Sequence, residues 1–366
     1  MRFLYVTTIG LTMIFFKDLV KKLIDDGNTV DIACNESEYK VDEFYRELGC
    51  NVYQINCSRS PFSKGNLEAI KELKKIISDN KYDIVHCHTP VAGACTRIAC
   101  KSFRKKGLKV FYTAHGFHFY KGAPLINWLI YYPIEKYCSK FTDILITINH
   151  EDESLAKKRM KTKKVEYVPG VGIDVDKFAN AVVDRAEKRQ ELGIPEDAIL
   201  ILSVGELNKN KNHQIVIRAL EELNDKNVHY MIAGEGALSD YLKNLSYELG
   251  VESQVHILGY REDTEQLYKI ADINAFPSIR EGLGLAAIEG MAAGLPLICL
   301  DNRGTRNYAE NNVNAFIITN LYDCADAINK LKSYSTRKSF GESGMITAKN
   351  FDVDIINKKM LEIYYR

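Results

Sequence analysis

Short runs of β-branched and other apolar residues alternate along this chain with longer stretches whose apolar residues recur every three or four positions. Before residue 170 the short runs lie at 3–8, 29–34, 50–55, 83–88, 109–114, 143–148 and 164–169. Amphipathic stretches stand between them, for example at 67–77 and 124–140. Such alternation is typical of parallel strands joined by crossover helices. The pattern therefore predicts an α/β protein.

The alternation breaks at Pro169-Gly170-Val171-Gly172 and then starts again. Proline and glycine are strong interruptions of regular structure, so this segment is interpreted as a hinge or linker. Later strand-like runs lie at 198–205, 228–234, 255–259, 272–278 and 295–300, with helix-like stretches at 213–223, 238–249, 264–270 and 285–293. We predict two doubly wound domains at 1–168 and 183–350, a linker at 169–182 and a closing helix at 351–366.

Composition is that of an ordinary soluble globular protein, with 46% hydrophobic and 27% charged residues. A chain of 366 residues is long enough to bury two cores. No apolar run is long enough to span a bilayer, and the N-terminus lacks the pattern of a signal peptide. The nine cysteines include no Cys-x-x-Cys pair, so we interpret them as reduced thiols of a cytoplasmic protein.

The net charge of +1 hides an asymmetry between the two halves. The chain carries a net +8 up to Gly170 and a net −7 after it, and no acidic residue lies between Asp83 and Glu135. A basic face of this kind attracts phosphates or an anionic membrane, although an ordinary solvated surface fits the same pattern. No nucleic-acid-binding module is visible, and the acidic second half disfavours general nucleic-acid binding.

Ligands of open parallel sheets bind at the carboxyl ends of the strands, so the residues that lie there are candidates. Gly10 follows the first predicted strand, where a glycine lets backbone approach a ligand, although a plain turn is as good an interpretation. His86 and His88 lie on the fourth strand and His115 follows the fifth. Two histidines without a third ligand make a weak metal site, and we predict none. His115 is the better candidate, because an imidazole can hydrogen-bond a sugar hydroxyl in either direction.

The loop after the first strand of the second half contains Lys209 and Lys211. Their ammonium groups suit the two charges of a diphosphate, to which the positive N-terminal end of the next helix would add. A solvated turn rich in Asn and Lys is the alternative.

The segment 280–290, REGLGLAAIEG, sets Glu281 and Glu289 eight residues apart across an almost wholly apolar span. An unpaired buried carboxylate is costly, so both charges need a purpose. We expect Glu281 on a loop and Glu289 within a helix, whose first amides, those of Leu285 and Ala286, would receive phosphate. Carboxylates accept hydrogen bonds from vicinal hydroxyls, and a nucleotide sugar carries hydroxyls at both ends.

With its surroundings at 277–296, this segment makes the chain resemble the retaining glycosyltransferases of family 4 over nearly its whole length. Further matches lie at 83–88, 113–116, 168–174 and 259–261. The resemblance implies the GT-B fold, in which two Rossmann-like domains face each other across a cleft and a C-terminal helix crosses back to the first domain.

The resemblance also implies roles for individual residues. Glu289 would hold the ribose hydroxyls of the nucleotide, Glu281 would hold the hydroxyls of the transferred sugar, and His115 would touch that sugar near the reacting carbon. The implied donor-binding set is Gly10, Gly205, Lys209, Lys211, Gly282, Leu283, Gly284, Leu285, Ala286 and Glu289. We expect His88, Lys105 and Lys106 to contact the acceptor. One departure stands out, because Glu206 occupies the place where the family usually has a phosphate-pairing arginine.

We therefore predict a retaining glycosyltransferase that needs neither metal nor cofactor. It would move a hexose or N-acetylhexosamine from a UDP-sugar to a polyprenyl-diphosphate-linked saccharide, in capsule or exopolysaccharide synthesis at the inner face of the cell membrane. Trp128, Tyr131 and Tyr132 would suit a membrane interface, although aromatic residues at helical spacing are more often core. Two alternatives stay open, a nucleotide-sugar 2-epimerase on the same fold and a catalytically silent nucleotide-binding member.

Overall fold

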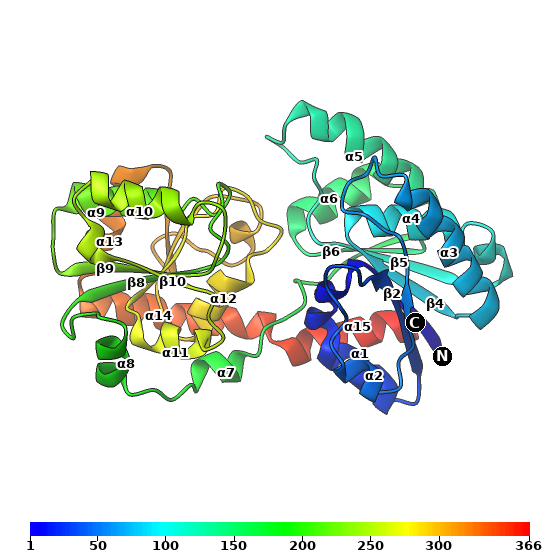
Figure 1. Ribbon diagram of the computed structural model, residues 1–366, viewed down its shortest axis with the longest axis horizontal. Coiled ribbons are helices and arrows are strands. Elements are labelled where there is room, and N and C mark those ends of the chain that lie inside the picture. The colour runs from blue at the N-terminus through cyan, green and yellow to red at the C-terminus, as the bar shows by residue number, and fades with distance from the viewer. The chain divides into compact units, whose positions relative to one another are not determined.

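The computed structural model describes all 366 residues and divides into two compact units (Figure 1). The first unit comprises Met1–Val171 together with Ile356–Arg366, and the second comprises Gly172–Ile355. Each unit is built around one parallel sheet. The chain passes from the first unit to the second after Val171 and returns within the last helix.

The first unit holds a seven-stranded sheet with the strand order β3-β2-β1-β4-β5-β6-β7, in which every neighbouring pair is parallel. Its strands are β1 (Arg2–Ile9), β2 (Thr29–Asn35), β3 (Val52–Gln54), β4 (Ile84–His88), β5 (Lys109–Ala114), β6 (Ile144–Thr147) and β7 (Lys164–Tyr167). The central strands β1 and β4 are buried on both faces. That burial is why their sequences read as continuous apolar runs instead of alternating ones.

Helices cover both faces of this sheet. They are α1 (Lys17–Asp25), α2 (Phe44–Glu47), α3 (Gly65–Asn80), α4 (Pro90–Cys100), α5 (Leu125–Cys138), α6 (His150–Arg159) and α15 (Val353–Tyr365). Short 3-10 helices lie at η1 (Gly10–Phe16), η2 (Phe103–Lys106) and η3 (Ser139–Phe141). One core joins the sheet to α3, α4, α5 and α6, and the other joins it to α1, α2 and α15.

The C-terminal helix α15 is part of the first unit from Ile356 onward. Ile356, Met360 and Ile363 pack into the core beneath it, as their helical spacing predicts. The hydroxyl of Tyr364 lies 2.6 Å from that of Tyr5 on β1. The last residues of the chain are thereby tied to its first strand.

The second unit holds a six-stranded parallel sheet with the order β10-β9-β8-β11-β12-β13. Its strands are β8 (Ile199–Val204), β9 (Val228–Ala233), β10 (Val255–Gly259), β11 (Ile273–Phe276), β12 (Leu297–Leu300) and β13 (Ala315–Ile318). In both sheets the strand order reverses beside the first strand of the unit. Such a reversal is where doubly wound folds bind their ligands.

The helices of the second unit complete its two outer layers (Figure 1). They are α7 (Val175–Ala179), α8 (Arg185–Glu191), α9 (Gln214–Leu223), α10 (Ser239–Glu248), α11 (Thr264–Ile270), α12 (Leu285–Ala292), α13 (Leu321–Lys330) and α14 (Tyr334–Ala348), with 3-10 helices η4 (Glu252–Gln254), η5 (Thr305–Asn307) and η6 (Lys349–Phe351).

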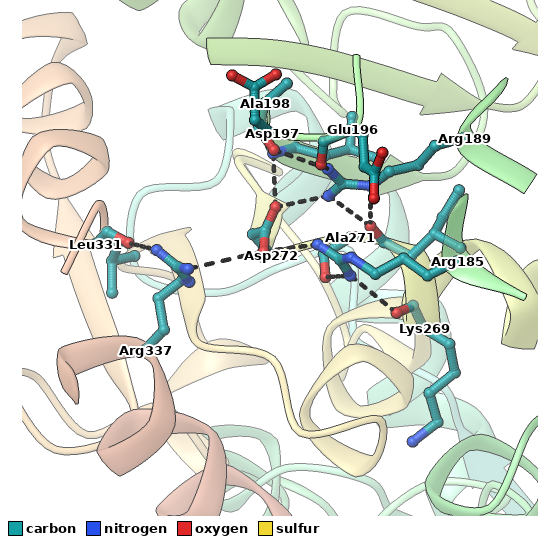
Figure 2. A network of polar contacts seen from close by, with 12 residues as sticks. Arg185, Arg189, Glu196, Asp197, Ala198, Lys269, Ala271, Asp272, Leu331 and Arg337 are labelled. Carbon is teal, nitrogen blue, oxygen red and sulfur yellow. Dashed lines mark hydrogen bonds and ion pairs between the residues drawn. The ribbon is translucent and has the colours of Figure 1, made fainter. Parts of the chain in front are cut away.

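A polar network ties α8 and α14 to the amino edge of the second sheet (Figure 2). The carboxylate of Asp272 is paired with Arg189 at 2.8 Å and Arg185 at 2.9 Å, lies 3.8 Å from Arg337, and accepts the amide of Leu200. Arg189 is buried and donates its remaining hydrogens to backbone carbonyls. The network lies at the opposite end of the strands from their carboxyl termini, so we assign it a structural role.

The prediction of an α/β protein with two doubly wound parallel sheets and a C-terminal helix is confirmed. Two local features differ from the prediction. Between the second and third strands, where the alternation predicts a crossover helix, only the four residues of α2 are α-helical. The predicted linker contains the short helix α7, because the carboxylate of Asp174 accepts the amide of Lys177 and caps it.

Candidate functional site

The loop between β11 and α12 brings two of the predicted residues of the second unit together. Lys211 Nζ lies 2.8 Å from Glu281 Oε1 and 4.9 Å from the centre of the Phe276 ring. Both charged side chains keep only about a fifth of their surface exposed, at 21% and 18%. A lysine from the loop after β8 therefore meets a carboxylate from the loop after β11, at adjacent strand ends.

The turn that carries Glu281 is held by contacts that the sequence did not reveal. Gly284 has φ +97°, and a Cβ there would overlap the ring of Phe276 at 2.7 Å. The Tyr308 hydroxyl donates to the carbonyl of Leu283 at 2.9 Å. Arg303 Nε donates to the carbonyl of Glu281 at 3.2 Å. These contacts fix the backbone of the turn before any ligand arrives.

Glu289 lies on α12, about one turn beyond Leu285, at which the helix begins. Burial raises the pKa of its carboxyl to about 7, although the neighbouring hydroxyl of Tyr268 opposes the shift. That hydroxyl lies 3.4 Å from Glu289 Oε2 and donates to the carbonyl of Ala286 at 2.7 Å. Tyr268 gave no signal in the sequence, because a buried aromatic residue on a helix normally indicates core packing.

The first turn of α12 supplies the predicted backbone donors. The helix begins at Leu285, so the amides of Leu285 and Ala286 have no carbonyl one turn earlier in the helix to accept their hydrogens. Gly282 and the buried Leu283 precede them in the turn. The loop and the helix N-terminus thus form a short stretch in which backbone N–H groups suit an anion.

The loop after β8 contains the other predicted residues of this unit, and they differ in exposure. Gly205 lies against Lys211, whose Cε would be 3.2 Å from a Cβ added at the glycine. Lys209 is exposed and lines a hollow together with Ile279. Glu206 is also exposed, so no buried carboxylate opposes a phosphate in this loop.

In the first unit the predicted histidines meet at the carboxyl ends of β4 and β5. His88 Nδ1 lies 3.2 Å from His115 Nε2, and His86 bonds the hydroxyls of Thr113 at 2.8 Å and Tyr364 at 2.5 Å. Burial lowers the pKa of His115 to about 4 and that of His86 to about 3, and it also lowers the pKa of His88. All three imidazoles are therefore neutral near pH 7.

Gly10 follows β1, as expected, but its surroundings are closed. A Cβ at this position would overlap the carbonyl of Tyr39 and lie 2.6 Å from the amide of Val41. The glycine is buried, and the backbone of residues 39–41 fills the space beside it. The close approach of the backbone of residues 39–41 leaves no room for a side chain, which accounts for a glycine at position 10.

Lys105 and Lys106 are not brought together with the histidines. They lie on η2, which precedes β5, whereas His115 follows the same strand. The six residues of β5 therefore separate them by about 20 Å. His88, the third residue of the predicted acceptor-binding group, is buried beside His115.

Three aromatic residues of α5 are partly buried against the core of the first unit. Trp128 and Tyr132 pack around Phe119, and Tyr131 stacks on His118. The core interpretation therefore fits them better than a membrane interface does.

Within the whole chain, no group of three or more His, Cys, Asp and Glu side chains is gathered as a metal site would require. All nine cysteines are buried and unpaired. No helix combines the length and the apolar character that crossing a bilayer requires.

Comparison with known families identifies both halves of the chain. Residues 184–345 match the family described as glycosyl transferases group 1, and residues 4–149 match the family described as glycosyl transferase 4-like. The two matched stretches contain the strand ends described above.

Two relatives are similar over most of their length. The putative glycosyltransferase EpsD of Bacillus subtilis is 38% identical over 320 residues, which cover 85% of this chain and 84% of EpsD. An Escherichia coli UDP-Gal:α-D-GlcNAc-diphosphoundecaprenol α-1,3-galactosyltransferase is 30% identical over 306 residues, covering 80% of this chain and 77% of that enzyme.

Solved structures share the fold. HepE of Anabaena, crystallised with UDP and with UDP-glucose, superposes with a TM-score of 0.82 in both cases, at 20% and 19% identity. The alignments cover 100% of this chain and 100% and 99% of the two HepE chains. With both family matches and a 38% identical relative, the chain belongs to the group 1, family 4-like glycosyltransferases and has their GT-B fold.

Proposed function

We propose that this glycosyltransferase moves a hexose or N-acetylhexosamine from a UDP-sugar to a polyprenyl-diphosphate-linked saccharide, with retention of anomeric configuration, in the synthesis of a capsule or exopolysaccharide. The observation that carries the proposal is the pairing of Lys211 with Glu281 at the turn into α12, with Glu289 further along the same helix. The arrangement offers a cation and backbone amides for a diphosphate, between carboxylates for hydroxyls on either side.

The relatives support the choice of substrates. EpsD, at 38% identity, is a putative glycosyltransferase, and the name of the Escherichia coli relative states a UDP-Gal donor and a diphosphoundecaprenol-linked acceptor. HepE, which has the same fold, has been crystallised with UDP and UDP-glucose. A UDP-sugar and a lipid-linked acceptor are therefore the first substrates to test.

In this proposal the donor is held along the loop and α12. Glu289 accepts hydrogen bonds from the ribose, and Glu281 accepts them from the transferred sugar. Lys211 and the amides of Leu285 and Ala286 bind the diphosphate. The rest of the donor-binding set is Gly10, Gly205, Lys209, Gly282, Leu283 and Gly284.

The proposed reaction is a front-face substitution at the anomeric carbon. The bond from that carbon to the phosphate oxygen breaks, and its electron pair leaves with UDP. An acceptor hydroxyl forms the new bond on the same face and gives its proton to the departing phosphate oxygen. His115, which is neutral near pH 7, would hydrogen-bond the sugar beside the reacting carbon. No side chain acts as a nucleophile.

We propose that the charge that develops on UDP is met by Lys211 and the first amides of α12, without a metal ion. Preorganised donors of this kind contribute a few kcal/mol each to transition-state stabilisation. Full turnover in excess chelator is the expected result. Activity that is lost in chelator and restored by magnesium would contradict this part of the proposal.

We also propose that the basic first unit docks on an anionic membrane, with Lys105 and Lys106 in contact with headgroups. Reversing both lysines to glutamate should reduce cosedimentation with vesicles containing anionic lipid, because juxtamembrane lysines contribute about 1 kcal/mol each. The control is the same double reversal to glutamate at Lys243 and Lys338, two exposed lysines of the second unit. Equal sedimentation of the two double variants would argue against this contact.

The experiment that tests the proposed function begins with a thermal-shift screen of nucleotide sugars. The donor that stabilises the protein is then incubated with and without a polyprenyl-diphosphate-linked saccharide. Transfer of sugar to the lipid, with retained configuration, is the expected result. An isomerised sugar formed from donor alone would indicate a 2-epimerase instead, and binding without turnover would indicate a silent member.

A further inference from the structure

An open apolar groove runs across the first unit between α3, α4 and α5. Figure 1 shows these helices on one side of the first sheet, and the groove between them has an empty volume of about 1030 Å³. Its apolar lining includes Phe62, Leu67, Ile70, Ala94, Ile98 and Ile134. Phe62 is 77% exposed and Leu67 is 66% exposed, so the walls of the groove are uncovered. Uncovered apolar side chains that line a concavity are typical of a ligand site.

A polar cavity continues from one end of this groove. The two share Pro90, Val91 and Tyr131 in their linings. The polar cavity lies at the carboxyl ends of β1 and β4, the same edge of the sheet at which His88 and His115 meet. A ligand could therefore have one end in the groove and the other at the candidate site of this unit.

Arg59 is the one formally charged residue in the lining of the polar cavity. The other residues of the lining with polar side chains are Thr8, Thr12, Thr89, His118 and Tyr131, of which Thr8 and Thr89 bond each other at 2.6 Å. Arg59 makes no ion pair, and its guanidinium lies 6.0 Å from the centre of the Tyr39 ring. A guanidinium that makes no ion pair, with no carboxylate in the lining, suits phosphate oxygens.

The apolar groove contains one carboxylate, and a buried arginine neutralises it. Glu135 Oε2 lies 2.8 Å from Arg97 Nη1, and Glu135 Oε1 accepts the Tyr112 hydroxyl at 3.0 Å. Lys64 also lines the groove and carries a positive charge. No uncompensated negative charge therefore repels an anionic ligand along the combined path.

We propose that the groove and cavity together bind the lipid end of the acceptor, with a diphosphate at Arg59 and the first isoprenoid units between Phe62, Leu67 and Ile98. This inference rests on the proposed function for the class of acceptor. An anionic head joined to a branched apolar chain matches a cation at one end of an apolar groove. The flat surface of a bilayer fits less well, because the lining is concave.

The test uses the full chain with saturating UDP, which keeps soluble diphosphates away from the donor site. Calorimetry compares farnesyl diphosphate with inorganic diphosphate. Farnesyl diphosphate is expected to bind at least about tenfold more tightly, because burial of its chain adds to the binding of its phosphates. Equal affinities would overturn the proposal. UDP binding is measured first, so a failure of the donor assignment is seen separately from a failure of the groove.

Variants locate the two ends of the ligand. Leu67→Asp should weaken farnesyl diphosphate about tenfold and leave inorganic diphosphate within about twofold, because it adds charge to an apolar wall. Ile346→Asp on α14, where the side chain is also exposed at 69%, is the matched control and should change neither. Arg59→Ala should weaken both diphosphates. Equal losses from the Leu67 and Ile346 variants would overturn the assignment of the groove.

A second variant fills the groove without adding charge. Ala94→Phe on α4 should weaken farnesyl diphosphate selectively, whereas Ala186→Phe on the exposed surface of α8 should not. If Leu67→Asp instead reduced cosedimentation with anionic vesicles while farnesyl diphosphate bound normally, the face would contact the bilayer itself and the proposal would be wrong.

Discussion

Each of the two units has its own doubly wound parallel sheet, but the residues at the carboxyl ends of the strands differ in charge between the units. In the second unit a lysine and a glutamate form an ion pair beside a helix N-terminus, and a second glutamate has a pKa near neutrality. In the first unit the corresponding edge holds three histidines that burial keeps neutral. The fold therefore sets where a site lies, and the residues after each strand decide what that site can bind.

This difference suggests that the two units contribute differently to binding and to turnover. Charged groups suit a ligand that carries fixed charge and many hydroxyls, as a nucleotide sugar does. Neutral imidazoles donate or accept a hydrogen bond without adding charge near a reacting carbon. Changes that break one set of contacts should therefore affect binding and turnover in different ways.

The largest effect is expected from Lys211→Ala in the second unit. The variant removes the cation next to the proposed diphosphate and leaves Glu281 without its partner at 2.8 Å. The ratio kcat/KM should fall about 100- to 1000-fold, as it does when one preorganised donor is lost. Lys330→Ala, which breaks an exposed ion pair with Asp326 on α13, is the control. Similar activity of the two variants would contradict the role of Lys211.

A smaller effect is expected from His115→Ala in the first unit. Loss of the proposed hydrogen bond to the reacting sugar should lower kcat about 10- to 100-fold and leave UDP affinity nearly unchanged. The control is His256→Ala on β10, which also breaks a contact between two histidines, at 3.0 Å from His229. A proportional loss of UDP affinity would place His115 in nucleotide binding instead.

The smallest effect concerns pH. With a pKa of about 7, Glu289 is mostly protonated at pH 6 and mostly ionised at pH 8, so affinity for a UDP-sugar should rise about tenfold over that range. Glu289→Gln should remove the dependence. A flat titration of the unaltered protein would show that the ionised carboxylate is not needed.

The same carboxyl links pH to stability. Burial makes the folded protein hold this proton more tightly than the unfolded chain does, so its contribution to stability is lost as pH rises through about 7. The unfolding midpoint of Glu289→Gln should therefore fall less between pH 5 and 8 than that of the unaltered protein. Parallel curves for the two proteins would contradict the raised pKa.

Most of the fold could be predicted from periodicity alone. Strands such as β4 are buried on both faces, so they appear in the sequence as continuous apolar runs between amphipathic stretches. Their type and order could therefore be predicted. The shortness of α2 and the presence of α7 were not, because capping by a single carboxylate such as Asp174 decides whether a few polar residues form a helix.

The residues proposed for the site were chosen because they lie in loops that follow strands or in the helix after such a loop. Lys211 and Glu281 lie in the loops after β8 and β11, and Glu289 lies on α12. Arg303 and Tyr308 come from the segment after β12, and their contacts with the 281–284 turn depend on tertiary packing that no local pattern encodes. Lys105 and Lys106 are a different case, because the predicted strand at 109–114 already places them before it and His115 after it, at opposite edges of the sheet.

The central claim is that Glu289 and Glu281 hold opposite ends of one donor. Calorimetry with UDP and with the matching UDP-sugar, on Glu289→Gln and Glu281→Gln, tests it most directly. Glu289→Gln should weaken both ligands by a similar factor, about tenfold, because both contain the ribose. Glu281→Gln should weaken the UDP-sugar alone, because UDP lacks the transferred sugar. Equal losses for both ligands in both variants, or unchanged UDP affinity in Glu289→Gln, would contradict the claim.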